Sequence, residues 1–244
     1  MGHESPCFCF YLASNIQRLS RALMNSPAPH IDHTLLKPET CSADIERICE
    51  EAVEYSFASV CIPPRFVPLA ARMVYGSVCQ VGTVVGFPFG YESTSAKVFQ
   101  TELAVAQGAA EVDMVIPVGA ALEGDMQAVA SDVEAVVRAA GTVRVKAIIE
   151  CCYLNERQKI ELSRLVADKG VAYVKTSTGF AYGGATLDDV RLLARTVAGR
   201  IKVKAAGGIR NWASCRAMLN AGADRVGTSA AVAIMQQWRN EAGL

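Results

Sequence analysis

The chain has 244 residues, enough for one large domain or two small ones, and its 24 basic side chains balance 24 acidic ones. The zero formal net charge and the lack of Lys/Arg runs argue against a nucleic-acid-binding protein. Apolar stretches are interrupted well before the roughly 18 residues that a membrane span needs, so we expect neither nucleic acid nor membrane as a partner.

Cysteines and histidines narrow the chemistry further. Nine cysteines are scattered along the sequence without a CxxC pair, and their number is odd. This pattern is typical of free thiols in a reducing compartment, so we expect a cytoplasmic protein. The three histidines, His3, His30 and His33, lie near the start and leave too few ligands for a catalytic zinc site. We therefore expect no metal and no organic cofactor.

Residues 1–29 are predicted to be an N-terminal segment ahead of the main domain. Within it, NIQRLSRALMN has the apolar spacing of a short amphipathic helix, which we expect to close one end of the domain. A transit peptide is the alternative, because Arg18 and Arg21 share this helix.

From residue 30 to 244 the sequence alternates short apolar runs with segments of helical spacing. The runs cover residues 31–38, 57–64, 80–87, 111–118, 143–150, 171–179, 201–208 and 224–231. Eight successive βα units require parallel strands with right-handed crossovers, and they close most naturally as a single (β/α)8 TIM barrel. A doubly wound open sheet is the alternative, although no GxGxxG opens the first unit.

Charged residues in the middle strands fall on one face. Alternate residues of a barrel strand point inward, and this parity aims Asp113, Lys146, Lys175 and Lys204 at the barrel interior. Crowded amines lower the pKa of at least one of them, through like-charge repulsion and desolvation. Because a neutral lysine attacks carbonyl groups, Lys175 is a candidate to form a Schiff base.

Position along each strand separates two roles. Glu111, Arg144 and Lys202 come early in their strands, where we expect an inert stabilising network such as a pair between Lys202 and Glu111. Lys175 and Lys204 come late and are followed by glycine-rich loops, which favours a catalytic role.

Three glycine-rich turns follow the last three strands: TSTGFAYGGAT, AAGGIRN and GTSAA. Backbone N–H groups in such turns can approach a phosphate, and barrel enzymes commonly hold phosphate after strands seven and eight. Each turn alone could be a tight connection that needs positive φ, but the three together predict a phosphate site.

The motifs EVDMVI, VKAIIE, VKTSTGF and VKAAGGIR, in this order and spacing, closely resemble the deoxyribose-phosphate aldolases, a family of class I aldolases with a (β/α)8 fold. The resemblance covers roughly residues 30 to 235. It implies reversible cleavage of 2-deoxy-D-ribose 5-phosphate to D-glyceraldehyde 3-phosphate and acetaldehyde, with a sugar phosphate and an aldehyde as the small-molecule partners. It also implies a role in deoxyribonucleotide catabolism, and we expect a homo-oligomer, either a dimer or a tetramer.

The same resemblance implies a set of site residues. Lys175 would form the Schiff base, and Lys204 and Asp113 would assist proton transfer. The substrate-binding residues would be Asp32, Thr34, Cys61, Lys146 and Thr176, with Gly179, Gly207, Gly208, Arg210, Gly227 and Ser229 around the phosphate.

Two departures from the family pattern limit this transfer. Phe180 stands where some members carry a lysine after TSTG, and no tyrosine follows Tyr182, whereas some members end in a tyrosine-bearing tail. The alternatives are another sugar-phosphate barrel enzyme, transaldolase-like or an isomerase, and a non-catalytic sugar-phosphate-binding barrel. Borohydride trapping and turnover of deoxyribose 5-phosphate distinguish them.

Overall fold

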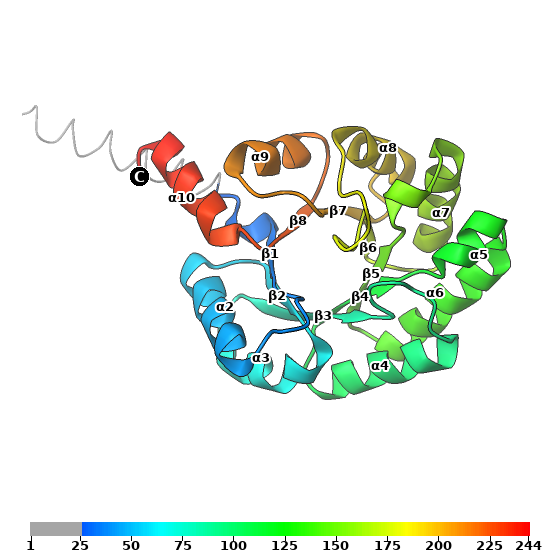
Figure 1. The fold of residues 1–244 in the computed structure, drawn as a ribbon, viewed down its shortest axis with the longest axis horizontal. Helices are drawn as coiled ribbons and strands as arrows, with labels where there is room; N and C mark the ends of the chain where they lie inside the picture. The colour runs from blue at the N-terminus through cyan, green and yellow to red at the C-terminus, as the bar shows by residue number, and fades with distance from the viewer. Residues whose placement is uncertain (1–25) are drawn as a thin grey trace, which may run out of the picture.

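The computed structural model describes residues 26–244, and the helix predicted in the N-terminal segment lies outside these described residues. Within them, eight parallel strands close into a barrel in which each strand pairs with the next and the last pairs with the first (Figure 1). The strands are β1 (Ile31–Thr34), β2 (Ser59–Ile62), β3 (Gln80–Val85), β4 (Glu111–Val115), β5 (Arg144–Ile148), β6 (Tyr173–Lys175), β7 (Lys202–Ala206) and β8 (Arg225–Thr228). The predicted barrel is confirmed, and the open-sheet alternative is wrong.

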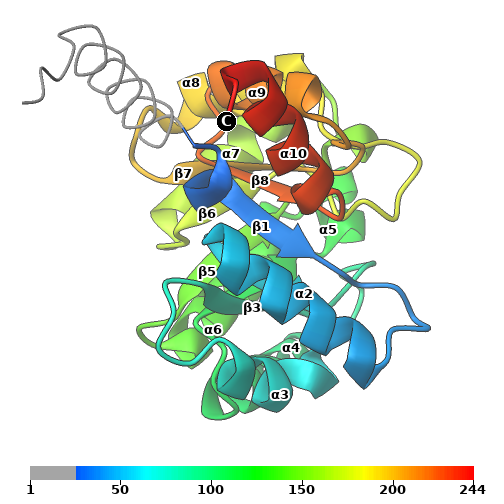
Figure 2. The ribbon, with the colours of Figure 1, turned by 90° about the vertical axis from the view of Figure 1, so that its left-hand side faces the viewer.

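Helices surround the strands and cover the outside of the barrel (Figure 1). Figure 2 shows β1 beside α2 and α10, the helices that close the ring where its first and last strands meet. The α-helices are α2 (Ser42–Tyr55), α3 (Val67–Met73), α4 (Thr94–Ala106), α5 (Val118–Glu123), α6 (Met126–Ala140), α7 (Glu156–Asp168), α8 (Leu187–Val197), α9 (Trp212–Asn220) and α10 (Ala231–Ala242). Short 3-10 helices are η1 (Ala28–His30), η2 (Pro64–Phe66) and η3 (Cys151–Tyr153). None of these helices is long and apolar enough to cross a membrane.

Helix α8 illustrates why the sequence folds this way locally. Thr186 caps its N-terminus, because the threonine hydroxyl accepts a hydrogen bond from the Asp189 backbone N–H at 3.0 Å. Val190, Leu193 and Val197 then follow at three- and four-residue spacing and are all buried against the barrel. The helix stops at Ala198, which adopts the left-handed conformation of a C-cap.

The strands separate an apolar layer from a polar interior. Val112, Val174 and Val203 are at most 1% exposed and belong to the hydrophobic core between the strands and the helices. Their neighbours of opposite parity are the charged residues that the sequence assigns to the interior. The register places Asp113 beside Lys146, and Lys175 beside Lys204, on adjacent strands.

Candidate active site

Asp113 lies at the centre of a buried cluster of charges inside the barrel. Its Oδ1 accepts a hydrogen bond from Lys146 Nζ at 2.9 Å. Its Oδ2 accepts from both Lys175 Nζ at 2.8 Å and Lys204 Nζ at 2.7 Å. Each of these four side chains is at most 3% exposed, so one carboxylate accepts hydrogen bonds from three lysine amines that have almost no access to water.

Two further carboxylates, those of Asp32 and Glu111, complete the cluster. Asp32 contacts Lys204 Nζ at 2.6 Å and also accepts from the Arg225 guanidinium. Glu111 accepts from Lys146 Nζ at 2.5 Å and lies 3.6 Å from Arg225 Nη2. Arg225 is not among the predicted site residues, although its inward parity at the start of the eighth run was a usable signal.

The buried cluster holds more cations than carboxylates. It contains the four basic groups Lys146, Lys175, Lys204 and Arg225 and the three carboxylates Asp32, Glu111 and Asp113. A surplus positive charge in a dry interior is costly, so one amine is favoured to be neutral.

The pKa shifts identify that amine as Lys175. Burial lowers the pKa of Lys175, Asp113 opposes this shift, and Lys204 adds to it. Burial also acts against the charge of Lys146 and Lys204, but nearby carboxylates outweigh it and raise the pKa of both. Their combined positive charge holds the pKa of Asp113 well below its ordinary value, against the effect of burial. Lys175 is therefore the lysine of this cluster with the best supply of free amine.

The structure differs from the predicted electrostatics in two details. Burial affects the pKa of Lys175 more than the repulsion from Lys204 does, although both lower it as expected. The pair between Lys202 and Glu111 is not formed, because Lys202 is exposed at the start of β7 and Glu111 contacts Lys146, Arg225 and the half-exposed Arg144 instead. The Glu111 carboxylate is thus part of the charged cluster.

A cavity of about 210 Å³ opens above Lys175 at the carboxyl ends of the strands. It brings together the predicted residues Thr34, Lys175, Gly179, Gly207, Gly208, Arg210, Gly227 and Ser229. Its wall also contains residues that were not predicted: Leu35, Leu36, Lys37, Thr178, Phe180, Ala206, Ile209 and Thr228. Lys37 and Arg210 are the cationic side chains in this wall besides Lys175.

The glycine-rich turns of this cavity pack backbone against backbone. Gly207 has φ +90°, and a Cβ on it would lie 3.0 Å from the Gly184 Cα and 3.4 Å from the Gly179 Cα. Only glycine fits such an approach at low cost, so the turn after β7 lies directly on the turn after β6.

The other predicted site residues do not line the cavity. Asp32, Asp113, Lys146 and Lys204 lie in the cluster of charges inside the barrel. Cys61 is buried in β2, and burial raises the pKa of its thiol, with the charges of the cluster acting on it as well.

Thr176 makes structural contacts at the end of β6. Its hydroxyl donates to the Ala206 carbonyl at 3.3 Å and accepts from the Ala206 N–H at 3.2 Å. The Thr176 side chain therefore ties β6 to β7 and does not turn toward the cavity.

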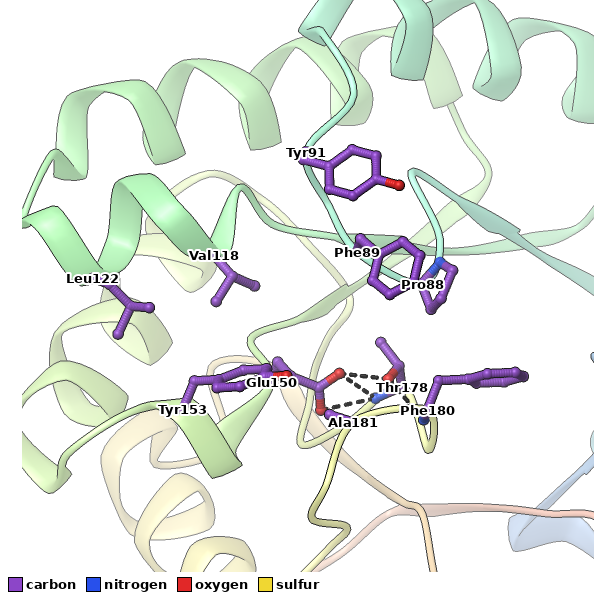
Figure 3. Close-up of a pocket in the computed structure, with 10 residues that line it drawn as sticks. All are labelled: Pro88, Phe89, Tyr91, Val118, Leu122, Glu150, Tyr153, Thr178, Phe180 and Ala181. Atoms are coloured by element: carbon purple, nitrogen blue, oxygen red, sulfur yellow. Dashed lines mark hydrogen bonds between the residues drawn. The ribbon is translucent and has the colours of Figure 1, made fainter.

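A second, mostly apolar pocket of about 260 Å³ adjoins the first and shares Thr178 and Phe180 with it (Figure 3). Its remaining lining residues are Pro88, Phe89, Tyr91, Val118, Leu122, Glu150, Tyr153 and Ala181. Glu150 is the one carboxylate in this wall, and burial raises its pKa against the hydrogen bonds from Thr178.

Comparison with known proteins agrees with this geometry. The sequence model of the DeoC/LacD family aldolases matches residues 28–237. A curated relative from Syntrophotalea carbinolica, named deoxyribose-phosphate aldolase, is 57% identical over 216 residues, which cover 88% of this chain and 98% of the relative. A relative of the same name from Carboxydothermus hydrogenoformans is 50% identical over 213 residues, covering 86% of this chain and 93% of the relative.

The fold comparison leads to the same family. The tetrameric structure of deoxyribose phosphate aldolase from Aeropyrum pernix is 28% identical with a TM-score of 0.83, covering 92% of this chain and 97% of that one. The chain belongs to the DeoC/LacD family of aldolases, and the family predicted from its sequence motifs is confirmed.

Proposed function

We propose that this chain cleaves 2-deoxy-D-ribose 5-phosphate reversibly to D-glyceraldehyde 3-phosphate and acetaldehyde, with Lys175 as the Schiff-base nucleophile. The predicted activity, that of a deoxyribose-phosphate aldolase, is confirmed by the two curated relatives, and the roles of single residues are our proposal. One observation carries these roles: Lys175 is the lysine of the buried cluster with a lowered pKa, and it lines the cavity beside the glycine-rich turns.

The first step uses the neutral amine of Lys175. It attacks the C1 aldehyde of the open-chain sugar, and loss of water leaves an iminium that withdraws electrons from C2. The C2–C3 bond then breaks, because the electron pair it releases is delocalised into the iminium as an enamine. Deep burial of Lys175 favours this step, since it lowers the pKa of the amine and so raises the fraction that is neutral.

Asp113 and Lys204 handle the protons of the reaction. Breaking the C2–C3 bond requires the C3 hydroxyl to lose its proton, and Asp113 or a water held by it is the nearby acceptor. The lysines around Asp113 lower its pKa, so it enters the reaction as a carboxylate that can accept a proton or a hydrogen bond. Lys204 shares the same carboxylate oxygen and can carry a proton toward the enamine, whose protonation and hydrolysis release acetaldehyde and free Lys175.

The phosphate is proposed to lie against the turns after β6, β7 and β8. Gly179, Gly207 and Gly208 have φ between +82° and +90°, which exposes backbone N–H groups that can donate to an anion. Arg210 adds a cation, and Ser229 lies just ahead of the N-terminus of α10. Phe180 occupies the place of the lysine seen in some members, so Arg210 and Lys37 supply the positive charge here.

Borohydride reduction in the presence of acetaldehyde tests the nucleophile. We expect a mass increase of one reduced acetaldehyde adduct per chain, mapped to the peptide that contains Lys175. An adduct on Lys146 or Lys204 would overturn the residue assignment. Turnover of deoxyribose 5-phosphate, measured through glyceraldehyde 3-phosphate, separates the aldolase from an isomerase or a non-catalytic binding protein.

We also propose a cytoplasmic homo-oligomer. The seven cysteines among residues 26–244 are all free thiols, which supports a reducing compartment. Large apolar side chains such as Tyr75, Val78 and Tyr91 are more than two-thirds exposed, which supports burial of some of this surface between copies of the chain. Light scattering distinguishes a monomer from a dimer or a tetramer.

A further inference from the structure

Glu150 lies just past the end of β5, where the hydrogen-bond ladder with the chain that follows β6 becomes irregular. The Ile149 N–H donates to the Lys175 carbonyl at 3.1 Å, and the Cys151 N–H donates to the Thr176 carbonyl at 2.8 Å. A regular parallel ladder advances two residues on both strands between successive bonds, whereas here the second strand advances only one. Glu150 is therefore an extra residue, a β-bulge of the kind that re-aims a side chain next to a functional site.

The irregular ladder requires an unfavourable backbone conformation at Glu150. Its φ of 53° and ψ of 68° lie in the left-handed region, which a residue with a Cβ adopts only at a cost in energy. A glycine would adopt this conformation freely. The structure must therefore gain something from the carboxylate that glycine lacks.

The Glu150 carboxylate forms hydrogen bonds with the turn after β6 (Figure 3). The Glu150 side chain is buried, and its two carboxylate oxygens each lie 3.2 Å from the Thr178 backbone N–H. The Thr178 hydroxyl donates to Glu150 Oε2 at 2.5 Å and accepts from the Phe180 N–H at 3.1 Å. The Glu150 carboxylate thus holds Thr178 at one end of the Thr178–Gly179–Phe180 turn, and the Thr178 hydroxyl holds Phe180 at the other.

The geometry points to Glu150 as a positioning residue that holds this turn in the shape that receives the substrate's phosphate end; the inference rests on the proposed function. Thr178, Gly179 and Phe180 all line the cavity that contains Lys175. Thr178 and Phe180 also separate it from the apolar pocket, whose wall includes Glu150.

Loss of the Glu150 carboxylate should affect the two ends of the substrate differently. Lys175 is held independently, by its pairing with β7 and by Asp113. The turn beyond it has Glu150 as its side-chain anchor. Binding of the phosphate should therefore weaken while Schiff-base formation is retained.

Glu150→Gln and Thr178→Val test this from both sides. Glutamine keeps the size but turns one acceptor oxygen into a donor that faces the Thr178 donors, and valine removes the hydroxyl. Each should raise the KM for deoxyribose 5-phosphate about tenfold, the loss expected for one charge-assisted hydrogen bond. The KM for unphosphorylated deoxyribose and the borohydride adduct on Lys175 should stay near wild type.

Coupling between the two residues is the sharper measurement. The double variant Glu150→Gln, Thr178→Val should lose no more than the larger single loss, because both substitutions break one hydrogen-bonded unit. Thr178→Ser keeps the hydroxyl that donates to Glu150, so its KM for deoxyribose 5-phosphate should rise far less than that of Thr178→Val. Asp125→Asn is the matched control, since it alters a carboxylate that caps the start of α6 by accepting from the Ala128 N–H at 2.9 Å and lines neither pocket, and it should change neither KM.

The possible failures are distinguishable. Equal losses for both sugars, or additive losses in the double variant, would overturn the positioning role of Glu150 while wild-type turnover upheld the proposed function. Absence of both turnover and a Lys175 adduct in the wild-type protein would overturn the proposed function itself. If Glu150→Gln fails to fold, the comparison of Thr178→Val with Thr178→Ser still decides the outcome on both substrates.

Discussion

Buried lysines occur in two places in this protein, outside the barrel strands and inside them, and they have different roles. Between helices α4 and α6, Lys97 is completely buried, and its Nζ donates to Asp132 Oδ2 at 2.7 Å and to the Val115 carbonyl at 2.9 Å. Asp132 also accepts from the Thr94 hydroxyl. One cation meets one carboxylate, and the neighbouring groups satisfy both. Such a pair fixes helices to the barrel and offers no reactive group.

Inside the barrel, the basic groups outnumber the carboxylates. Asp113 Oδ2 accepts from both Lys175 and Lys204, and four cations share three carboxylates. The contrast shows that burial alone does not make a lysine reactive, since Lys97 is as buried as Lys175. Competition for too few carboxylates is what leaves one amine poorly compensated.

The largest effect should come from removing the poorly compensated amine. Lys175→Arg keeps a positive charge, but a guanidinium stays protonated at any working pH and is no nucleophile. We expect no borohydride adduct and a fall in kcat of at least about 10³-fold, measured with deoxyribose 5-phosphate. Retained turnover in this variant would place the nucleophile elsewhere and remove the distinction between the two groups.

Disrupting the Lys97–Asp132 pair should lower the stability of the fold without changing the catalytic rate. Lys97→Met leaves Asp132 buried without its cation, which should lower the free energy of unfolding by about 3–5 kcal/mol in urea titrations. Turnover per folded molecule should stay near wild type. The partly exposed pair between Lys169 and Glu134 offers a control, since Lys169→Met should change the unfolding free energy far less. A selective loss of kcat in Lys97→Met would contradict the division between the two groups.

Much of the barrel and its interior could be predicted from local pattern. Period-two alternation in EVDMV and VRVKAI assigns Asp113 and Lys146 to the interior, because a helix-facing charge would stand among valines. The turns with Gly179 and Gly207 are equally visible, since few other sequences favour positive φ so strongly.

The partners of these charges could not be predicted, because they depend on register across distant strands. Arg225 contacts Asp32 only because the first and last strands meet, which brings together residues that are far apart in the sequence. Likewise, Glu111 lies early in β4, yet the stagger of the barrel places its carboxylate against Lys146. The bulge at Glu150 has no sequence signal, since a glutamate in VKAIIE gives no indication of positive φ.

Lys204→Met examines how much of the pKa shift of Lys175 comes from its neighbour. Two charges at a separation of about 5 Å and an effective dielectric constant of about 20 repel by roughly 3 kcal/mol. Burial remains in this variant and is the larger cause of the lowered pKa of Lys175, so only part of the shift should be reversed. Because the pKa rises, Lys175 stays protonated to higher pH.

The acid limb of borohydride trapping should therefore move upward by about one to two pH units in Lys204→Met. Trapping is the right measurement, because Lys204 also carries protons and its loss lowers turnover for either reason. Lost turnover with an unmoved acid limb would show that Lys204 is a proton carrier only.

The smallest expected effect concerns the phosphate end, far from the amines. Ser229 is exposed between β8 and α10 and lines the cavity. A carboxylate introduced by Ser229→Asp, roughly 6 Å from a bound phosphate at an effective dielectric constant of about 40, costs about 1.4 kcal/mol. The KM for deoxyribose 5-phosphate should rise about tenfold, inhibition by inorganic phosphate should weaken equally, and unphosphorylated deoxyribose should be spared. Ser95→Asp adds the same charge at the exposed first turn of α4 and should change neither constant. Equal losses for both sugars in Ser229→Asp would mean that the turns after β6, β7 and β8 shape the cavity without holding the phosphate.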